Sequence, residues 1–205
     1  MIELSCLSAK VDTMINEEPR SYHQFRHPNL FHMKGSWKSN TVDKYLRPIR
    51  QQMVDLVHPD TTVVDIGCGN GDLLFQLADK IASGTGLDYS QSLIEYARQR
   101  KHVEQINNLH FRQADLREEL TIDQVDYALA SLVFHVLPRE VAQNVLQQMV
   151  HRATTPLVCA FSEPQSRKQQ FLLWLDQRFS GHFSHFKEYQ KRGGMEQLIR
   201  SIENT

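Results

Sequence analysis

Short apolar runs alternate with amphipathic stretches along most of this chain. Apolar or alternating segments at residues 63–66, 109–112, 125–130 and 157–161 read as strands, and residues 84–88 read as the end of another. Between and beyond them lie segments with apolar residues at helical spacing, such as residues 140–151. Alternation of strands and helices predicts an α/β fold with one doubly wound, mainly parallel sheet and helices on both of its faces.

The two ends of the chain carry different patterns. Residues 1–20 show no clear period, whereas residues 21–37 gather aromatic and histidine side chains. A helical stripe from residue 41 to residue 57, interrupted by Pro48, predicts an N-terminal helical cap that is kinked or split. We therefore divide the chain into an arm or lid, residues 1–40, and a domain, residues 41–205.

The most informative stretch is Val63–Gly71, which reads VVDIGCGNG and leads into a helical pattern. Strand, glycine turn and helix in this order bring backbone close to a nucleotide-like ligand. A dinucleotide fingerprint needs Gly-x-Gly-x-x-Gly, but here the third glycine comes one residue early and Asp72 takes its place. No Gly-Lys-Ser/Thr follows to hold phosphates. Asp65, two residues before the first glycine, suits a ligand with a cationic end.

This Asp-x-Gly-x-Gly-x-Gly pattern resembles the first motif of the class I S-adenosylmethionine-dependent methyltransferases. The resemblance continues in order through Gly84–Asp88, Gln113–Leu116 and Ser131–Pro138, and covers about residues 42–164. It implies a Rossmann-like sheet that binds S-adenosylmethionine at the carboxyl ends of its first three strands. The family's sheet usually ends in a β-hairpin, and no run after Phe161 alternates with period two, so we expect that hairpin to be absent.

The resemblance also implies roles for individual residues. Asp65 is expected to hold the glycine turn and the ammonium end of the cofactor, with capping of the loop amides as its alternative role. Asp88 is expected to accept hydrogen bonds from the ribose hydroxyls, and Asp115 to take the adenine amino group. The predicted cofactor-binding set is Asp65, Gly67, Cys68, Gly69, Gly71, Asp88, Tyr89, Ala114, Asp115, Leu116 and Ser131.

Candidate acceptor-side residues are fewer. His135 is the only titratable side chain in the segment 131–138, and an unperturbed pKa near 6.5 suits a general base. Packing in the pocket wall is the stronger alternative for His135. Tyr22 and Trp37 are candidate substrate contacts, with anchoring of the arm as the alternative. We expect no metal site, because the pairs His23/His27 and His182/His185 lack a recognisable third ligand.

The composition bears on the partners and the cellular compartment that we expect for this protein. The net charge of −1 argues against a large electrostatic nucleic-acid surface. Three cysteines without metal-binding spacing are most simply reduced thiols of a cytoplasmic protein. The sequence contains no run of about 18 apolar residues, so it does not predict a membrane-spanning helix.

These observations predict methyl transfer from S-adenosylmethionine to a small-molecule acceptor by in-line displacement. An RNA or protein methyltransferase, and a cofactor-binding subunit that is inactive without its partner, remain open alternatives. Without the hairpin, the fifth strand would be a bare sheet edge. We expect residues 166–202, a second copy of the chain or a partner subunit to cover it.

Overall fold

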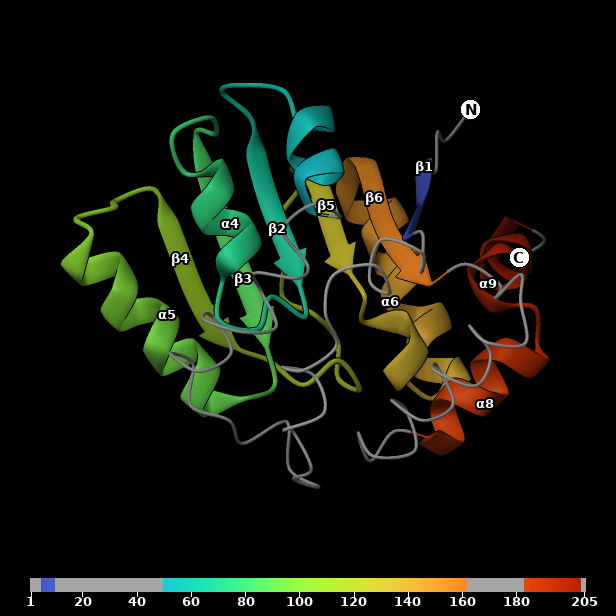
Figure 1. The fold of residues 1–205 in the computed structure, drawn as a ribbon. Coiled ribbons are helices and arrows are strands. Elements are labelled where there is room, and N and C mark those ends of the chain that lie inside the picture. The colour runs from blue at the N-terminus through green and yellow to red at the C-terminus, as the bar shows by residue number, and fades with distance from the viewer. Residues whose placement is uncertain (1–4, 10–49, 162–182, 204–205) are drawn as a thin grey trace, which may run out of the picture.

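The structure is a computed structural model that describes residues 5–9, 50–161 and 183–203. Six strands form one sheet in the order β1-β6-β5-β2-β3-β4, and every neighbouring pair is parallel (Figure 1). The strands are β1 (Ser5–Ala9), β2 (Thr62–Ile66), β3 (Ser83–Asp88), β4 (Leu109–Gln113), β5 (Val125–Ser131) and β6 (Ala153–Phe161). The helices are α4 (Asp72–Leu77), α5 (Gln91–Val103), the 3-10 turn η3 (Phe134–Val136), α6 (Arg139–Arg152), α8 (Phe183–Lys191) and α9 (Gly194–Glu203). Residues 50–56 are also helical.

The predicted fold class is confirmed. The chain winds from β2 outward through β3 to β4, then returns to the other side of β2 for β5 and β6. The strand order therefore reverses between β2 and β5, and in such sheets the crevice at this switch point is where ligands bind. All five strands expected from the apolar runs are present. In the described residues after β6 the chain is helical, in α8 and α9.

The edge of the sheet differs from expectation. Ser5–Ala9, where no element is predicted, forms β1 and pairs in parallel with Leu157–Phe161 of β6. Residues 166–202 are expected to cover this edge, but β1 pairs with it instead. In the described part of that range, α9 does contact β6, and α8 and α9 also pack against η3, α6 and each other. A strand from the chain's own N-terminus thus satisfies the backbone groups along this half of β6.

Strand β6 is also longer than its apolar run predicts. It begins at Ala153 and includes Pro156, which lies opposite Ala128 of β5. Proline is tolerated in a strand with an open side, and residues before Leu157 have no β1 residue opposite them in the register.

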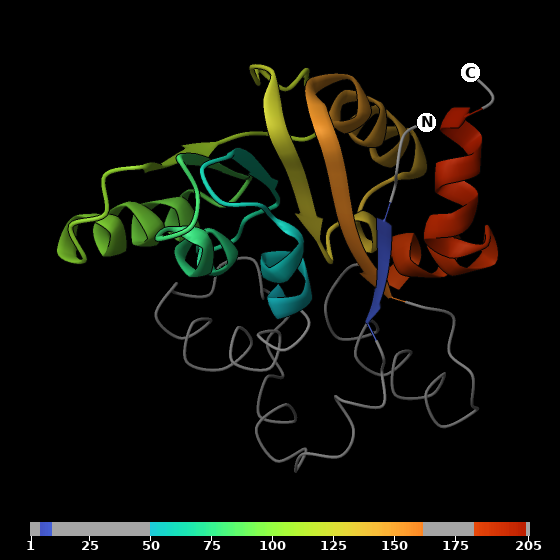
Figure 2. The same cartoon turned by 90° about the horizontal axis from the view of Figure 1, so that it is seen from above.

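Helices cover both faces of the sheet, which confirms the doubly wound arrangement (Figure 2). On one face, residues 50–56, α4 and α5 pack on side chains of the strands such as Val63 and Leu129. On the other face, α6 and α9 pack on Val64, Ile66 and their neighbours. Alternate residues of β2 therefore serve opposite cores, and both layers hold β2 and the loop that follows it in place. No helix among the described residues is both long and apolar enough to cross a bilayer.

Candidate functional site

The glycine loop follows β2 at the switch point. Gly67, Gly69 and Gly71 have φ angles of +74°, +58° and +82°, a region that disfavours every residue with a Cβ. The N–H groups of Gly67 and Cys68 both donate to the carbonyl oxygen of Leu87, at 2.8 and 2.9 Å. The loop is therefore fastened to the end of β3, and its glycines are required by backbone conformation.

Space around the loop imposes the same requirement. A Cβ on Gly67 would lie 2.7 Å from Cγ2 of Val133, in the segment after β5. A Cβ on Gly71 would lie 2.5 Å from Cε1 of Phe111 in β4. Both distances are far below van der Waals contact. Neighbouring elements thus press on the loop backbone from both sides, which fixes the position of its amides.

Asp88 connects the loop to the next strand. Its Oδ2 accepts a hydrogen bond from the N–H of Gly69 at 2.7 Å, and its Oδ1 accepts one from the N–H of Ser90 at 2.8 Å. Asp88 therefore caps an amide of the glycine loop, the alternative role that the sequence offered for Asp65. Asp65 itself lies at the end of β2 and is 2% exposed. Ser90 is the N-cap of α5 by position, but its hydroxyl makes no capping hydrogen bond.

A second acidic residue lies beyond β4. The N–H of Ala114 donates to the carbonyl oxygen of Asp88 at 3.0 Å, which joins the ends of β3 and β4. The carboxylate of Asp115 accepts hydrogen bonds from the backbone N–H and the guanidinium of Arg117. These bonds hold the pKa of Asp115 below its ordinary value. The guanidinium carbon of Arg117 also lies 5.8 Å from the ring centre of Tyr89, which is 58% exposed.

Arg117 was missed by sequence reasoning, although an arginine two residues after Asp115 is a visible signal. Adenine binding by Asp115 stays a prediction, since an amino group would share its oxygens with Arg117. Cys68 and Leu116 supply apolar wall rather than polar contacts, because both are buried among core residues. The Cys68 thiol donates a weak hydrogen bond to the carbonyl oxygen of Gly69 at 3.6 Å.

The segment after β5 borders the same switch point, and it contains the predicted acceptor-side residue His135. The Oγ of Ser131 is buried and has no hydrogen-bond partner among the described residues. Leu132 follows with a φ angle of +56°, and its N–H donates to the carbonyl oxygen of Cys159 at 2.8 Å. His135 lies in η3 and is 8% exposed. A left-handed leucine is strained, and strain of this kind gathers at functional sites. Nothing in the sequence marks it.

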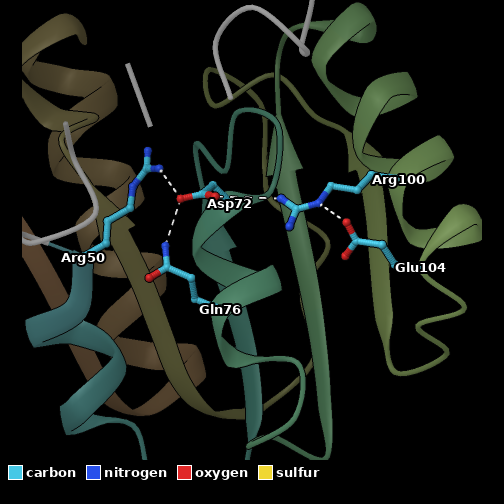
Figure 3. A network of polar contacts seen from close by, with 5 residues as sticks. All are labelled: Arg50, Asp72, Gln76, Arg100 and Glu104. Atoms are coloured by element: carbon cyan, nitrogen blue, oxygen red, sulfur yellow. Dashed lines mark hydrogen bonds and ion pairs between the residues drawn. The ribbon is translucent and has the colours of Figure 1, made fainter. Parts of the chain in front are cut away.

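A network of charged and polar side chains is centred on Asp72, the residue directly after the glycine loop (Figure 3). Asp72, the first residue of α4, is 2% exposed, and its Oδ2 accepts hydrogen bonds from Arg50 at 3.2 Å and Gln76 at 2.8 Å. Its Oδ1 lies 3.8 Å from Arg100, which also pairs with Glu104 at 2.7 Å. The residue that breaks the dinucleotide fingerprint thus joins α4 to α5 and to residues 50–56. An acid in the first turn also suits the positive end of the helix dipole.

Some predicted site residues cannot be placed. Tyr22 and Trp37 lie outside the described residues, as do His23, His27 and His182. Within the described ranges, no three His, Cys, Asp or Glu side chains gather as metal ligands do.

The residues present fit an adenosyl group with a charged tail. Asp88 is a fixed carboxylate at the strand end where ribose hydroxyls bind in such sheets. Tyr89 offers an exposed ring next to it. The buried Ser131 hydroxyl faces no protein partner in the described structure, so it is available to a ligand.

Comparison with known proteins supports this interpretation. The methyltransferase domain family matches residues 57–198. The 23S rRNA (uracil(1939)-C(5))-methyltransferase RlmD of Enterobacter sp. (strain 638) is 33% identical over 79 residues, which are 36% of this chain and 18% of RlmD. Aklanonic acid methyltransferase DauC of Streptomyces sp. (strain C5) is 34% identical over 80 residues, 35% of this chain and 36% of DauC. The chain thus spans about a fifth to a third of the length of these curated relatives.

A solved structure has the same fold. YcgJ from Bacillus subtilis superposes with a TM-score of 0.50 at 16% identity, over 62% of this chain and 57% of that one. A chain of the complex between the Haloferax volcanii Trm112 methyltransferase activator and a methyltransferase gives a TM-score of 0.49 at 25% identity, over 62% and 59%. By the family match, which spans more than half of its residues, the chain belongs to the methyltransferase domain family and is a class I S-adenosylmethionine-dependent methyltransferase domain.

Proposed function

We propose that this chain transfers the methyl group of S-adenosylmethionine to a small-molecule acceptor by in-line displacement. The observation that carries the proposal is the segment after β5, where the unsatisfied Ser131 hydroxyl and the buried His135 lie within five residues. Both groups are enclosed by the core, so an acceptor must enter the crevice to meet them. A small molecule does this more readily than a folded RNA or protein surface.

Different residues of the chain would bind and orient different parts of the two reactants. S-adenosylmethionine supplies a methyl group on a positively charged sulfur, so the protein mainly has to position the reactants and exclude water. Asp88 and the glycine loop would hold the ribose, and Asp65 the ammonium end. Ser131 would hydrogen-bond a group at the reaction centre. A ring nitrogen of His135 would take the acceptor's proton where the acceptor atom carries one.

The relatives leave the acceptor class open, since one is named for an rRNA uracil and another for aklanonic acid. The net charge of −1 gives little support to an RNA substrate held by phosphate contacts. A cofactor-binding subunit that needs a partner is the remaining alternative, and transfer of a labelled methyl group would separate it from both kinds of enzyme.

The decisive experiment incubates the purified chain and radiolabelled S-adenosylmethionine with three fractions of a cell extract: small metabolites, RNA and protein. We expect label in the metabolite fraction. His135→Asn should lower the rate by about 100-fold if His135 is the base, while calorimetry shows unchanged affinity for S-adenosylhomocysteine. His102→Asn, at an exposed site on α5, is the matched control and should transfer at the native rate.

Other outcomes assign other functions. Label confined to RNA or to protein would contradict a small-molecule acceptor and favour the corresponding macromolecular enzyme. Binding of S-adenosylhomocysteine without label in any fraction would favour a cofactor-binding subunit. An unchanged rate in His135→Asn would leave His135 with its packing role.

A further inference from the structure

Arg117 covers the acidic residue that we expect to bind adenine. The carboxylate of Asp115 accepts hydrogen bonds from the backbone N–H of Arg117 at 3.0 Å, from its Nε at 2.9 and 3.0 Å, and from its Nη2. These contacts involve both carboxylate oxygens, and a carboxylate offers about four acceptor positions in all. Among the described residues, Arg117 alone therefore takes up the accepting capacity of Asp115.

The backbone and the side chain of Arg117 contribute differently. The backbone N–H bonds to the carboxylate two residues earlier, a local turn that fixes how Asp115 is oriented. The guanidinium is not needed for that orientation. The Arg117 side chain is 65% exposed and that of Asp115 22%, and an ion pair this exposed adds little to stability. The guanidinium can therefore leave at small cost, while the turn keeps the carboxylate in place.

This ion pair lies next to the expected ribose site. The side-chain amide of Gln113 donates to the carbonyl oxygen of Tyr89 at 3.0 Å, which ties the chain before Asp115 to the end of β3. The base of adenosine is bonded directly to its ribose, so adenine held at Asp88 would extend along this junction. The guanidinium carbon of Arg117 lies 5.8 Å from the ring centre of Tyr89. We therefore expect the base and the guanidinium to meet here.

Their hydrogen-bonding needs conflict. The amino group of adenine is a donor, and so is every N–H of a guanidinium. Both groups need the oxygens of Asp115, which Arg117 already occupies. An amino group can bind there only where the guanidinium gives up a position.

We propose that Arg117 limits the affinity of the adenine subsite, and thereby its preference for a base that carries an amino group. In the empty site the guanidinium closes Asp115. When the cofactor binds, the guanidinium leaves at least one carboxylate oxygen, and the amino group of adenine takes its place. A base without an amino group leaves Arg117 where it is. This inference concerns the cofactor, beyond the proposed acceptor, and it rests on the predicted adenine contact of Asp115.

Calorimetry on the whole chain tests this with two probes, S-adenosylhomocysteine and its analogue with hydrogen in place of the amino group. Both are zwitterions without net charge. Arg117→Ala should bind S-adenosylhomocysteine about three-fold more tightly than the native chain, because no exposed ion pair has to be broken. It should bind the analogue with native affinity. Arg152→Ala, at the exposed last residue of α6, removes the same charge and should leave both affinities unchanged.

Two further readouts separate competition for Asp115 from a structural role. The gain in Arg117→Ala should shrink as salt rises from about 0.1 M to about 1 M, because salt weakens the ion pair of the native chain. Asp115→Ala should weaken binding of S-adenosylhomocysteine, and adding Arg117→Ala to it should bring no gain, since no carboxylate is left to uncover. Thermal unfolding verifies that each variant is folded.

Several results would overturn the proposal. One is native or weaker affinity of Arg117→Ala for S-adenosylhomocysteine. An equal gain with the amino-free analogue would mean that Arg117 obstructs the ring of Tyr89 rather than the oxygens of Asp115. Unchanged affinity in Asp115→Ala would remove the adenine contact on which the inference rests. Because none of these measurements needs methyl transfer, the labelled-methyl assay can refute the proposed function while this inference stands, and the reverse.

Discussion

Replacing Asp72 by alanine should destabilise the fold and weaken cofactor binding together. Asp72 is 2% exposed and begins α4, directly after the last glycine of the loop. Its carboxylate binds Arg50, whose side chain is 8% exposed, and Gln76, and it faces Arg100 (Figure 3). The substitution removes the carboxylate and leaves the buried guanidinium of Arg50 without this partner.

The magnitude follows from burial. Removing one partner of a buried ion pair costs about 3–5 kcal/mol. The contact with Arg100 is longer, and 22% of the Arg100 side chain is exposed, so we assign it less than about 1 kcal/mol. We expect about 3 kcal/mol in total, the lower end of that range, because the 3.2 Å distance between Arg50 Nη1 and Asp72 Oδ2 is long for a charge-assisted hydrogen bond. For a chain of 205 residues this lowers the midpoint of thermal unfolding by about 6–12 °C.

Thermal and urea unfolding measure the effect, and calorimetry with S-adenosylhomocysteine measures the coupled loss of affinity. Glu104→Ala is the matched control, because it removes the other carboxylate that pairs with Arg100. Glu104 is 42% exposed, so its loss should cost less than about 0.5 kcal/mol. The double variant Arg50→Met with Asp72→Leu should be more stable than Asp72→Ala alone, because it removes both buried charges.

Three results would refute this reasoning. Equal costs for Asp72→Ala and Glu104→Ala would mean that burial does not set the strength of the network. A double variant no more stable than Asp72→Ala would mean that the loss of the Asp72 partner of Arg50 is not the source of the destabilisation. Unchanged cofactor affinity at full folding would mean that the network does not position the glycine loop.

Three further predictions concern the loop and the strand starts. Asp88→Ala should weaken S-adenosylhomocysteine binding by about 1–3 kcal/mol in calorimetry, because it removes the acceptor for the Gly69 and Ser90 amides as well as a charged partner for the ligand; native affinity would contradict this. Gly71→Ala should lower the unfolding free energy by about 1–3 kcal/mol in urea titration, since its Cβ meets Phe111 at 2.5 Å and its φ is +82°. Hydrogen bonds from Thr62 lower the pKa of Asp126, so the stability that it contributes is present above the unfolded-state pKa near 3.9 and is lost as pH falls through the folded-state value. Asp126→Asn should therefore reduce the dependence of the urea midpoint on pH below about pH 4, whereas Asn at the exposed Asp123 should leave it unchanged.

The sequence predicts the central sheet well because two signals indicate its strands: their composition and the residues at their ends. Most of these strands are apolar runs, and a glycine or an acidic residue ends or follows them, as at Gly67 and Asp88. Strand β1 escapes prediction because Ser-Cys-Leu-Ser-Ala is short and of mixed polarity, and its state depends on pairing with β6. Pro156 hides the first half of β6 for a similar reason, since a proline argues against a strand unless one side is open.

Residues of the candidate site divide in the same manner. Sequence position alone identifies the glycines and Asp88, because their spacing determines where they lie at the strand ends. The sequence shows Asp72 only as a mismatch to the dinucleotide fingerprint. It does not predict the ion pairs of Asp72, because Arg50 and Arg100 are 22 and 28 residues away. It gives no signal for the left-handed φ of Leu132, which depends on the tertiary hydrogen bond to Cys159.

The two sides of the proposed cofactor site differ in how they are ordered. On the ribose side, both oxygens of Asp88 already accept backbone amides at 2.7 and 2.8 Å, and each retains further lone-pair capacity for a ligand hydroxyl. We therefore expect ligand binding there to need no movement of the loop and to have a low ordering cost. On the adenine side, the oxygens of Asp115 are held largely by the exposed guanidinium of Arg117, a side chain that can exchange partners. The affinity for the cofactor should therefore depend strongly on Asp88, which is held by backbone amides. The position of the Arg117 side chain should affect how Asp115 contacts the adenine base.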